Sequence, residues 1–403
     1  MIPRPIHPFP ARMAGSIPWE VLEATNREKL RVLDPMVGSG TTAVVARALG
    51  HEAVGFDTDP LAILIAQTWC DDIDEETVRR TAKRVLDRAT VAARSIRLAD
   101  AYPRNADEET KTFTRYWFDE TNRRQLTALA SAVQATRNAT VRRVLWCSFS
   151  RLIITKQASA AMALDVAHSR PHRVTDRKPI RPFEHFLRAV ETVLKASPFS
   201  RGQTGGPPPA HIEPGDARKL PLEDATIDVV ITSPPYLNAI DYLRGHKFSL
   251  AWMGHPVSGL REVRATNIGT EVGAGAKLDD PVVAAAMVEM GDIQGLPARE
   301  RRQLARYLSD MARVLGEIHR VLKPGGAAVL VVGDTTRRGV FVRNSEALVH
   351  LGEVHGLDLV ERTQRALPPN RRYLPPPSSD DAGEALDARL RNEVLLTFEK
   401  SAG

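Results

Sequence analysis

Residues 232–236 read Thr-Ser-Pro-Pro-Tyr, a composition suited to holding a small polar group. Proline has a fixed φ angle and no N–H, and the residue before a proline is pushed toward extended geometry. We therefore expect a stiff loop that presents carbonyl oxygens and few donors. Ser233 adds a hydroxyl and Tyr236 a flat ring, so the loop could hold an exocyclic amino group while the ring stacks on a base. A rigid turn without a ligand is the alternative interpretation.

A second segment, Asp34–Thr42, reads Asp-Pro-Met-Val-Gly-Ser-Gly-Thr-Thr and follows a short apolar run. Its glycines allow close approach of a ligand, and the helix start behind them offers unpaired N–H groups to a carboxylate or phosphate. A phosphate-binding P-loop needs lysine after the last glycine, but Thr41 follows Gly40, and the GxGxxG fingerprint is not met cleanly. Asp57 ends the next apolar run, where a carboxylate can accept hydrogen bonds from ribose hydroxyls, and Asp59 is the alternative for that role. A tight turn without a ligand remains the other interpretation.

Strand and helix patterns alternate around both segments. Apolar runs at 29–33 and 52–56 predict two strands, and residues 43–49 between them predict a helix that Gly50 ends. Such a compact strand–helix–strand unit implies a parallel sheet. The other predicted strands are 227–231, 327–332 and 393–398, and a long amphipathic helix is predicted over 304–322. The sequence thus predicts an α/β fold with a mainly parallel sheet.

Residues 67–205 have a different pattern, with apolar residues at helical spacing around 126–133 and 141–152. We expect a mostly helical insertion that ends in a linker-like stretch at 202–209. The predicted division is therefore a catalytic domain formed by 1–66 and 206–403, with the insertion 67–205 as a region that could bind DNA.

The composition is that of an ordinary globular protein, with 403 residues of which 43% are apolar and 26% charged. We find no apolar run long enough to span a membrane and no apolar core of a secretory signal. Cys70 and Cys147 form no CxxC or Cys/His pattern, so neither a disulfide framework nor a bound metal is expected. We expect a reduced, cytoplasmic protein. The net charge of +6 permits a nucleic-acid partner without requiring one.

Together the two segments resemble those of the amino-methylating DNA methyltransferases, which use S-adenosyl-L-methionine. Residues 34–42 are similar to that family's cofactor loop, and 232–236 to its catalytic loop. The serine form of the catalytic loop is associated with cytosine-N4 enzymes, whereas aspartate is commoner in adenine-N6 enzymes. Residues 7–13 resemble the stretch that closes over the methionine part of the cofactor, and 215–218 the third strand end, where Asp216 would meet the adenine ring.

The resemblance implies a Rossmann-like class I methyltransferase fold and a set of site residues. The implied cofactor contacts are Phe9, Pro10, Asp34, Pro35, Gly38, Ser39, Gly40, Thr41, Thr42, Asp57, Asp59 and Asp216. The implied catalytic residues are Ser233, Pro234, Pro235 and Tyr236.

The chemistry that this loop suggests is activation of an amino group. The cytosine amine is a poor nucleophile because its lone pair is delocalised into the ring. We hypothesise that the Ser233 hydroxyl and the Pro234 carbonyl accept its two N–H groups, with Tyr236 stacking on a flipped base. Neither cysteine lies in a Pro-Cys loop, which argues against methylation at cytosine C5. Residues 241–242 either line the same pocket or pack a helix.

Basic stretches at 168–188, 244–264 and 362–374 are the candidate DNA contacts, although each could also be a solvated face. The residues selected are Arg170, Arg173, Arg244, Lys247, Arg261, Arg264, Arg371 and Arg372. The segment 244–300 is the first choice for a loop over DNA, and the helical insertion is the second.

Our interpretation is a site-specific DNA methyltransferase that acts on cytosine N4 in double-stranded DNA with the base flipped out. Adenine-N6 methylation is the first alternative, and RNA is another possible substrate. The alternative that is not an enzyme is a degenerate methyltransferase fold that binds DNA without turnover. A restriction or defence system could supply a partner; the sequence leaves the oligomeric state open.

Overall fold

A computed structural model describes residues 2–10, 12–174, 176, 178–199, 206–237, 241–269, 280–367 and 392–401. Its centre is a seven-stranded sheet with the order β10-β11-β7-β6-β1-β2-β5. The strands are β1 (Arg31–Asp34), β2 (Glu52–Asp57), β5 (Ala210–Pro214), β6 (Ile227–Thr232), β7 (Leu322–Val332), β10 (Leu357–Ala366) and β11 (Asn392–Lys400). Pairing is parallel from β5 to β7, and β11 runs antiparallel to both of its neighbours. The expected Rossmann-like α/β fold with a mainly parallel sheet is confirmed.

Alternating side chains of the buried strands enter two separate cores, one on each face of the sheet. Val229 and Ile231 of β6 pack into one core, whereas Val230 between them packs into the other. The first face is covered by α1 (Ser16–Ala24), α2 (Thr41–Ala48) and α3 (Pro60–Cys70). The second is covered by α11 (Pro281–Glu289), α12 (Ala298–Val321) and α13 (Asn344–Val354). This two-sided burial explains why the strands are continuous apolar runs.

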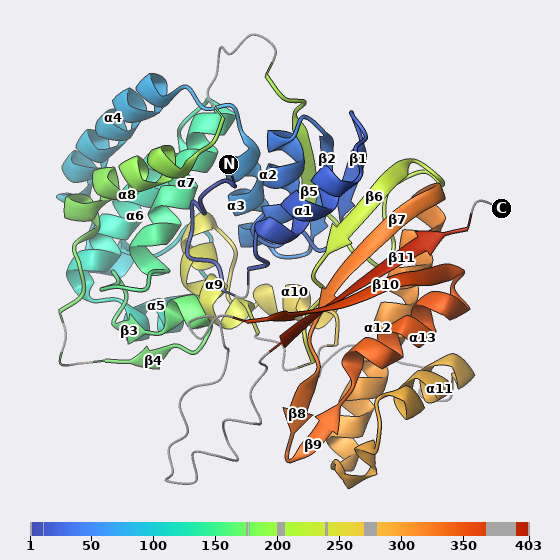
Figure 1. The fold of residues 1–403 in the computed structure, drawn as a ribbon. Coiled ribbons are helices and arrows are strands. Elements are labelled where there is room, and N and C mark those ends of the chain that lie inside the picture. Colours follow the sequence, from blue (N-terminus) through green and yellow to red (C-terminus); the bar gives the residue numbers. More distant parts are fainter. Residues whose placement is uncertain are drawn as a thin grey trace.

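Five longer helices form the expected helical insertion, on the left of Figure 1. They are α4 (Glu75–Ala93), α5 (Glu108–Trp117), α6 (Glu120–Gln134), α7 (Ala139–Ile153) and α8 (Pro182–Ala196), with a small hairpin of β3 (Ala163–Leu164) and β4 (His172–Arg173). Four begin at a capping side chain: Asp74, Asp107, Asp119 or Asn138 accepts the N–H three residues on. Their apolar faces join the same core as α2 and α3. The linker-like stretch expected at 202–209 lies partly outside the described residues.

The remaining elements lie at the carboxyl ends of the parallel strands. Helices α9 (Leu243–Leu250) and α10 (Leu260–Thr266) follow the loop after β6, and Figure 1 shows both at the end of the sheet toward which β6 points. A hairpin of β8 (Thr335–Arg337) and β9 (Val340–Val342) follows β7. No helix in the described part of the chain is both long and apolar enough to cross a bilayer.

Candidate active site

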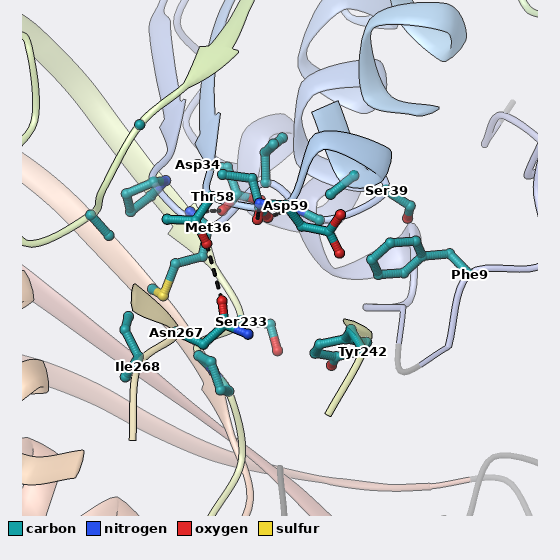
Figure 2. A pocket seen from close by; sticks show the side chains of 18 of the residues that line it. Phe9, Asp34, Met36, Ser39, Thr58, Asp59, Ser233, Tyr242, Asn267 and Ile268 are labelled. Atoms are coloured by element: carbon teal, nitrogen blue, oxygen red, sulfur yellow. Dashed lines mark hydrogen bonds between the residues drawn. The ribbon is translucent and has the colours of Figure 1, made fainter. Parts of the chain in front are cut away.

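One cavity lies at the carboxyl ends of β1, β2 and β6. The strand order changes direction here, because β2 and β5 follow on one side of β1, and β6 and β7 on the other. Figure 2 shows Phe9 and Tyr242 on one side, Met36, Asn267 and Ile268 on the other, and Ser233 between them. The expected site residues that line the cavity are Phe9, Asp34, Pro35, Gly38, Ser39, Thr41, Asp57, Asp59, Asp216, Ser233 and Pro235. Those outside its lining are Pro10, Gly40, Thr42, Pro234 and Tyr236.

The turn between β1 and α2 depends on two glycines in the left-handed region, with φ of 49° at Gly38 and 92° at Gly40. A Cβ at Gly40 would lie 2.9 Å from the Cα and Cβ of Ala66 on α3. Gly40 is therefore required by helix packing, while Gly38 lies on the cavity wall.

Two hydroxyls at the start of α2 are buried without a partner. Ser39 Oγ and Thr41 Oγ1 have no hydrogen bond among the described residues, and both side chains line the cavity. A buried hydroxyl that makes no hydrogen bond is costly, so both are expected to bind a ligand. The unpaired N–H groups of the first turn of α2 add donors suited to a carboxylate.

Asp34 places a carboxyl group at the end of β1, and its side chain is held from two directions. Thr232 Oγ1 on β6 donates to it across 2.7 Å, and the Met36 N–H donates across 3.2 Å. Thr42 of α2 donates to the Ile231 carbonyl of β6 at 3.0 Å and so joins the start of the helix to that strand. Burial raises the pKa of Asp34 to about 6, although the Thr232 hydrogen bond opposes this shift. The group is therefore mostly ionised at pH 7.

Asp57, the expected ribose contact, and Asp59, the alternative for that role, have different surroundings. Both Asp57 oxygens accept backbone N–H groups, from Gly38 and Asp59, each at 2.9 Å. Burial, with the nearby Asp59 charge, raises the pKa of Asp57 to about 7. Asp59 accepts the Leu61 N–H at the start of α3 and pairs with buried His246. Burial alone would raise the pKa of Asp59, but His246 and the backbone donors hold it below its ordinary value.

Asp216 follows β5 on the far side of the cavity and is fixed by Arg218. The Arg218 guanidinium binds Asp216 at 2.8 Å and also Asp310 on α12 at 2.8 Å. It donates to the Thr266 carbonyl as well, at 2.7 Å. Thr266 and the adjoining Asn267 line the cavity, and Asn267 accepts the Thr58 hydroxyl at 3.2 Å. Arg218 therefore joins the end of β5 to the segment after α10.

Phe9 reaches the cavity from the N-terminal segment and packs on α9. Its ring is stacked on Tyr242 with centroids 5.6 Å apart and lies 5.1 Å from the His246 ring. Tyr242 lines the cavity, which was one of the two interpretations for residues 241–242. Asp241 instead binds Arg264 at 2.9 Å and Arg244 at 3.5 Å.

The loop after β6 is fixed by three neighbouring strands. Ser233 Oγ donates to the Val331 carbonyl of β7 at 3.1 Å. The Tyr236 hydroxyl donates to Glu393 Oε1 of β11 at 3.1 Å. Arg337 of β8 donates to the Leu237 carbonyl. The loop thus crosses the end of β7, and Tyr236 lies toward β11 rather than in the cavity lining.

The candidate DNA contacts include five exposed arginines, of which Arg244, Arg261 and Arg264 are also paired with acidic side chains. Arg170 and Arg173 are exposed, and Arg173 lies over the Tyr116 ring. Arg244 and Arg264 share Asp241, and Arg261 pairs with Glu109 at 2.6 Å. Lys247 lies over the Phe113 ring, and burial lowers its pKa. Arg371 and Arg372 lie outside the described residues.

Several cavity residues were not selected individually from the sequence: Arg12, Met13, Met36, Val37, Thr58, Ala62, Gly215, Ala217, Thr266, Asn267 and Ile268. Six of them lie within the segments 7–13, 34–42 and 215–218 that the sequence analysis identified, and Thr58 lies between Asp57 and Asp59. Thr266, Asn267 and Ile268 have no such signal, because they lie at the end of an ordinary short helix and directly after it.

Both cysteines lie away from this chemistry. Cys70 and Cys147 are buried, and burial raises the pKa of each thiol to about 12. Neither lines the cavity. A thiolate nucleophile is therefore not available from either residue near neutral pH.

Comparison with known proteins gives a family match over part of the chain. The N6_N4_Mtase family model, described as DNA methylase, matches residues 6–68. The type II methyltransferase M.BsoBI of Geobacillus stearothermophilus is 22% identical over 61% of this chain and 52% of its own length. M.MvaI of Kocuria varians is 20% identical over 91% of this chain and 84% of its own length. M.MjaII of Methanocaldococcus jannaschii is 22% identical over 60% of this chain and 61% of its own length. The matches thus span only about half to three fifths of M.BsoBI and M.MjaII.

Solved structures also align with the chain. One is a SAM-dependent methyltransferase from Methanosarcina mazei, with TM-score 0.34, 10% identity and coverage of 95% of this chain and 98% of that one. Another is a TehB-like SAM-dependent methyltransferase from Corynebacterium glutamicum, with TM-score 0.31 and 10% identity. The alignment covers 97% of this chain and 89% of that one.

The family match covers the N-terminal segment, the glycine turn and Asp57, which together form much of the cavity wall. S-adenosyl-L-methionine is the cofactor of this family, as the sequence predicted. Residues 6–68 of the chain thus match the DNA methylase family model, and the curated relatives of the chain are type II methyltransferases.

Proposed function

We propose that the chain is an S-adenosyl-L-methionine-dependent DNA methyltransferase that methylates the N4 amine of cytosine. The observation that carries the base assignment is the Ser233 hydroxyl. Its proton is directed to the Val331 carbonyl, so its oxygen presents lone pairs to the cavity that it lines. A neutral acceptor in this position suits any aromatic amino group whose lone pair must lose its delocalisation. The choice of cytosine over adenine follows from the serine form of the loop, which is associated with cytosine-N4 enzymes.

The cavity residues fit the cofactor that the family uses. When bound, it supplies a methyl group carried on a positively charged sulfur. The ionised Asp34 suits the ammonium of its amino-acid end, and the unpartnered Ser39 and Thr41 hydroxyls with the first turn of α2 suit its carboxylate. Asp57 remains the proposed ribose contact, because carboxylate oxygens that accept one N–H each retain further lone pairs. We assign Asp59 mainly to the α3 cap and His246, and Asp216 to the adenine side.

The chain's own residues act on the amine by accepting its protons in hydrogen bonds. Ser233 Oγ accepts one N–H group, and the Pro234 carbonyl accepts the other. These acceptors oppose delocalisation of the nitrogen lone pair into the ring, and they stabilise positive charge as it grows on nitrogen. Pro235 lines the cavity and restricts the loop to one conformation. Tyr236 stacks on the flipped base.

The insertion supplies a proposed DNA contact on a loop that packs against a cavity residue. Ser169 donates to the Tyr242 carbonyl at 3.3 Å, so the loop that carries Arg170 packs directly on a cavity residue. Arg170 and Arg173 are exposed, whereas Arg244, Arg261 and Arg264 are partly neutralised by acids. We therefore favour the insertion over the 244–264 segment as the first phosphate contact.

The test is mass spectrometry of nucleosides from host DNA after expression of the chain, beside a Ser233→Ala/Tyr236→Ala variant. We expect N4-methylcytosine only with the intact chain. N6-methyladenine would keep the mechanism but overturn the base assignment. Neither mark in DNA, with none in RNA, would favour a binding protein without turnover. A restriction or defence partner would be sought only after a mark is found.

A further inference from the structure

Glu393 is a buried carboxylate, and the cost of burying its charge requires an explanation. It is the second residue of β11, and only 6% of its surface is exposed. In the antiparallel register, Val394 pairs with Val332, the last residue of β7. Glu393 therefore sits beside the carboxyl end of β7, the same edge of the sheet that carries the loop after β6. Burying a carboxylate is costly unless it is paired and hydrogen-bonded.

The two oxygens of Glu393 face different partners. Oε1 accepts the Tyr236 hydroxyl at 3.1 Å, and Oε2 lies 4.0 Å from Arg365 Nη1. Arg365 is the cross-strand neighbour of Glu393 on β10. The carboxylate is thus charge-balanced from the edge of the sheet and presents its other oxygen to the catalytic loop.

This contact helps to fix the end of the loop beyond Ser233, where Arg337 also donates to the Leu237 carbonyl. Ser233 is held by β7, one strand from β6, whereas Tyr236 is held by β11, two strands from β6. The second attachment restricts rotation of the tyrosine ring about its side-chain bonds. A hydrogen bond from a phenol to a buried carboxylate is among the stronger ones in proteins.

We propose that Glu393 is a positioning residue that holds the Tyr236 ring in the orientation required to stack on the target base. The proposal rests on the proposed function for the role of the ring, and on the geometry for the contact. It adds to the site a residue from the carboxyl-terminal strand, far from the cofactor and catalytic motifs in sequence.

A double-mutant cycle tests this role through kcat and the KM for DNA. We expect Glu393→Ala to lower kcat about tenfold, the size expected for one lost charged hydrogen bond, and to leave cofactor affinity within about twofold. In a Tyr236→Phe background the same change should cost less than about twofold, because the hydroxyl is already gone. Glu399→Ala, an exposed glutamate of the same strand, is the control. Equal losses in both backgrounds would overturn the proposal.

A spectroscopic measurement keeps the test independent of activity and of the more disruptive alanine variant. The chain has six tyrosines, which can be labelled with 3-fluorotyrosine, and the Tyr236 ¹⁹F resonance is the one lost in Tyr236→Phe. Glu393→Gln should shift this resonance, and Glu399→Gln should not. An unmoved resonance would overturn the proposal even in an active enzyme. A wild-type chain that methylates no nucleic acid would overturn the proposed function, while the resonance still decides whether Glu393 holds Tyr236.

Discussion

Ser233 Oγ on the loop after β6 donates its proton to the backbone carbonyl of Val331 on β7, across 3.1 Å. The hydroxyl is therefore oriented before any substrate arrives, and reorientation does not have to accompany the reaction. Preorganised groups of this kind are effective because they cost no rearrangement at the moment of reaction.

The first prediction concerns this hydroxyl. Ser233→Ala should lower kcat about 100-fold, in the range found when one preorganised hydrogen-bonding group is removed. Cofactor affinity, measured by calorimetry, should change by less than about threefold, because the cofactor contacts lie on other strands. Ser95→Ala, which removes an exposed hydroxyl after α4, serves as the control. A variant that keeps wild-type kcat would exclude the acceptor role of Ser233.

The second prediction concerns pH. Burial raises the pKa of Asp57 to about 7 and that of Asp34 to about 6, so both carboxyls are charged at pH 8 and protonated at pH 5. Affinity for the cofactor product S-adenosylhomocysteine should therefore fall as the pH is lowered from 8 to 5, by up to about tenfold through Asp34 and up to about 100-fold through Asp57. Calorimetry from pH 5 to 8 measures this.

Matched variants separate the two carboxyls. Asp57→Asn should remove the part of the pH dependence of affinity that lies near pH 7. Asp87→Asn, at an exposed position on α4, should leave the pH dependence unchanged. A pH-independent affinity in the wild-type protein would contradict the proposed contacts of Asp34 and Asp57.

The third prediction concerns the glycine turn. Gly40→Ala combines a left-handed φ of 92° with a Cβ 2.9 Å from Ala66, and we expect it to lower the free energy of unfolding by about 2–5 kcal/mol. Gly254 has a similar φ of 96° and no atom within 4 Å of an added Cβ. Gly254→Ala should therefore lose only about 1–2 kcal/mol. Urea unfolding compares the two, and equal losses would show that packing against Ala66 is unimportant.

The sequence predicted the centre of the sheet well because its strands are buried on both faces and read as apolar runs. It missed β10, whose residues are mostly exposed and so show no apolar pattern. The cofactor side of the site could be predicted because its residues lie within short motifs on β1 and β2. Asn267 and Glu393 could not, because each reaches the site from a distant segment through tertiary packing alone. Tyr236 was identified by its motif, but its attachment to β11 has no local signature.

The last prediction concerns DNA. Arg170 and Arg173 are exposed beside a loop that packs on Tyr242, so each is expected to neutralise one phosphate. The plot of log K for DNA against log salt should then be shallower by about 0.9 for each arginine removed. Fluorescence anisotropy with a labelled duplex, from about 50 to 200 mM salt, gives this slope. Arg97→Ala, at an exposed arginine that pairs with Asp100, is the control and should leave the slope unchanged. A double variant Arg170→Ala/Arg173→Ala with the wild-type slope would exclude this loop as a phosphate contact and return the choice to the segment 244–264.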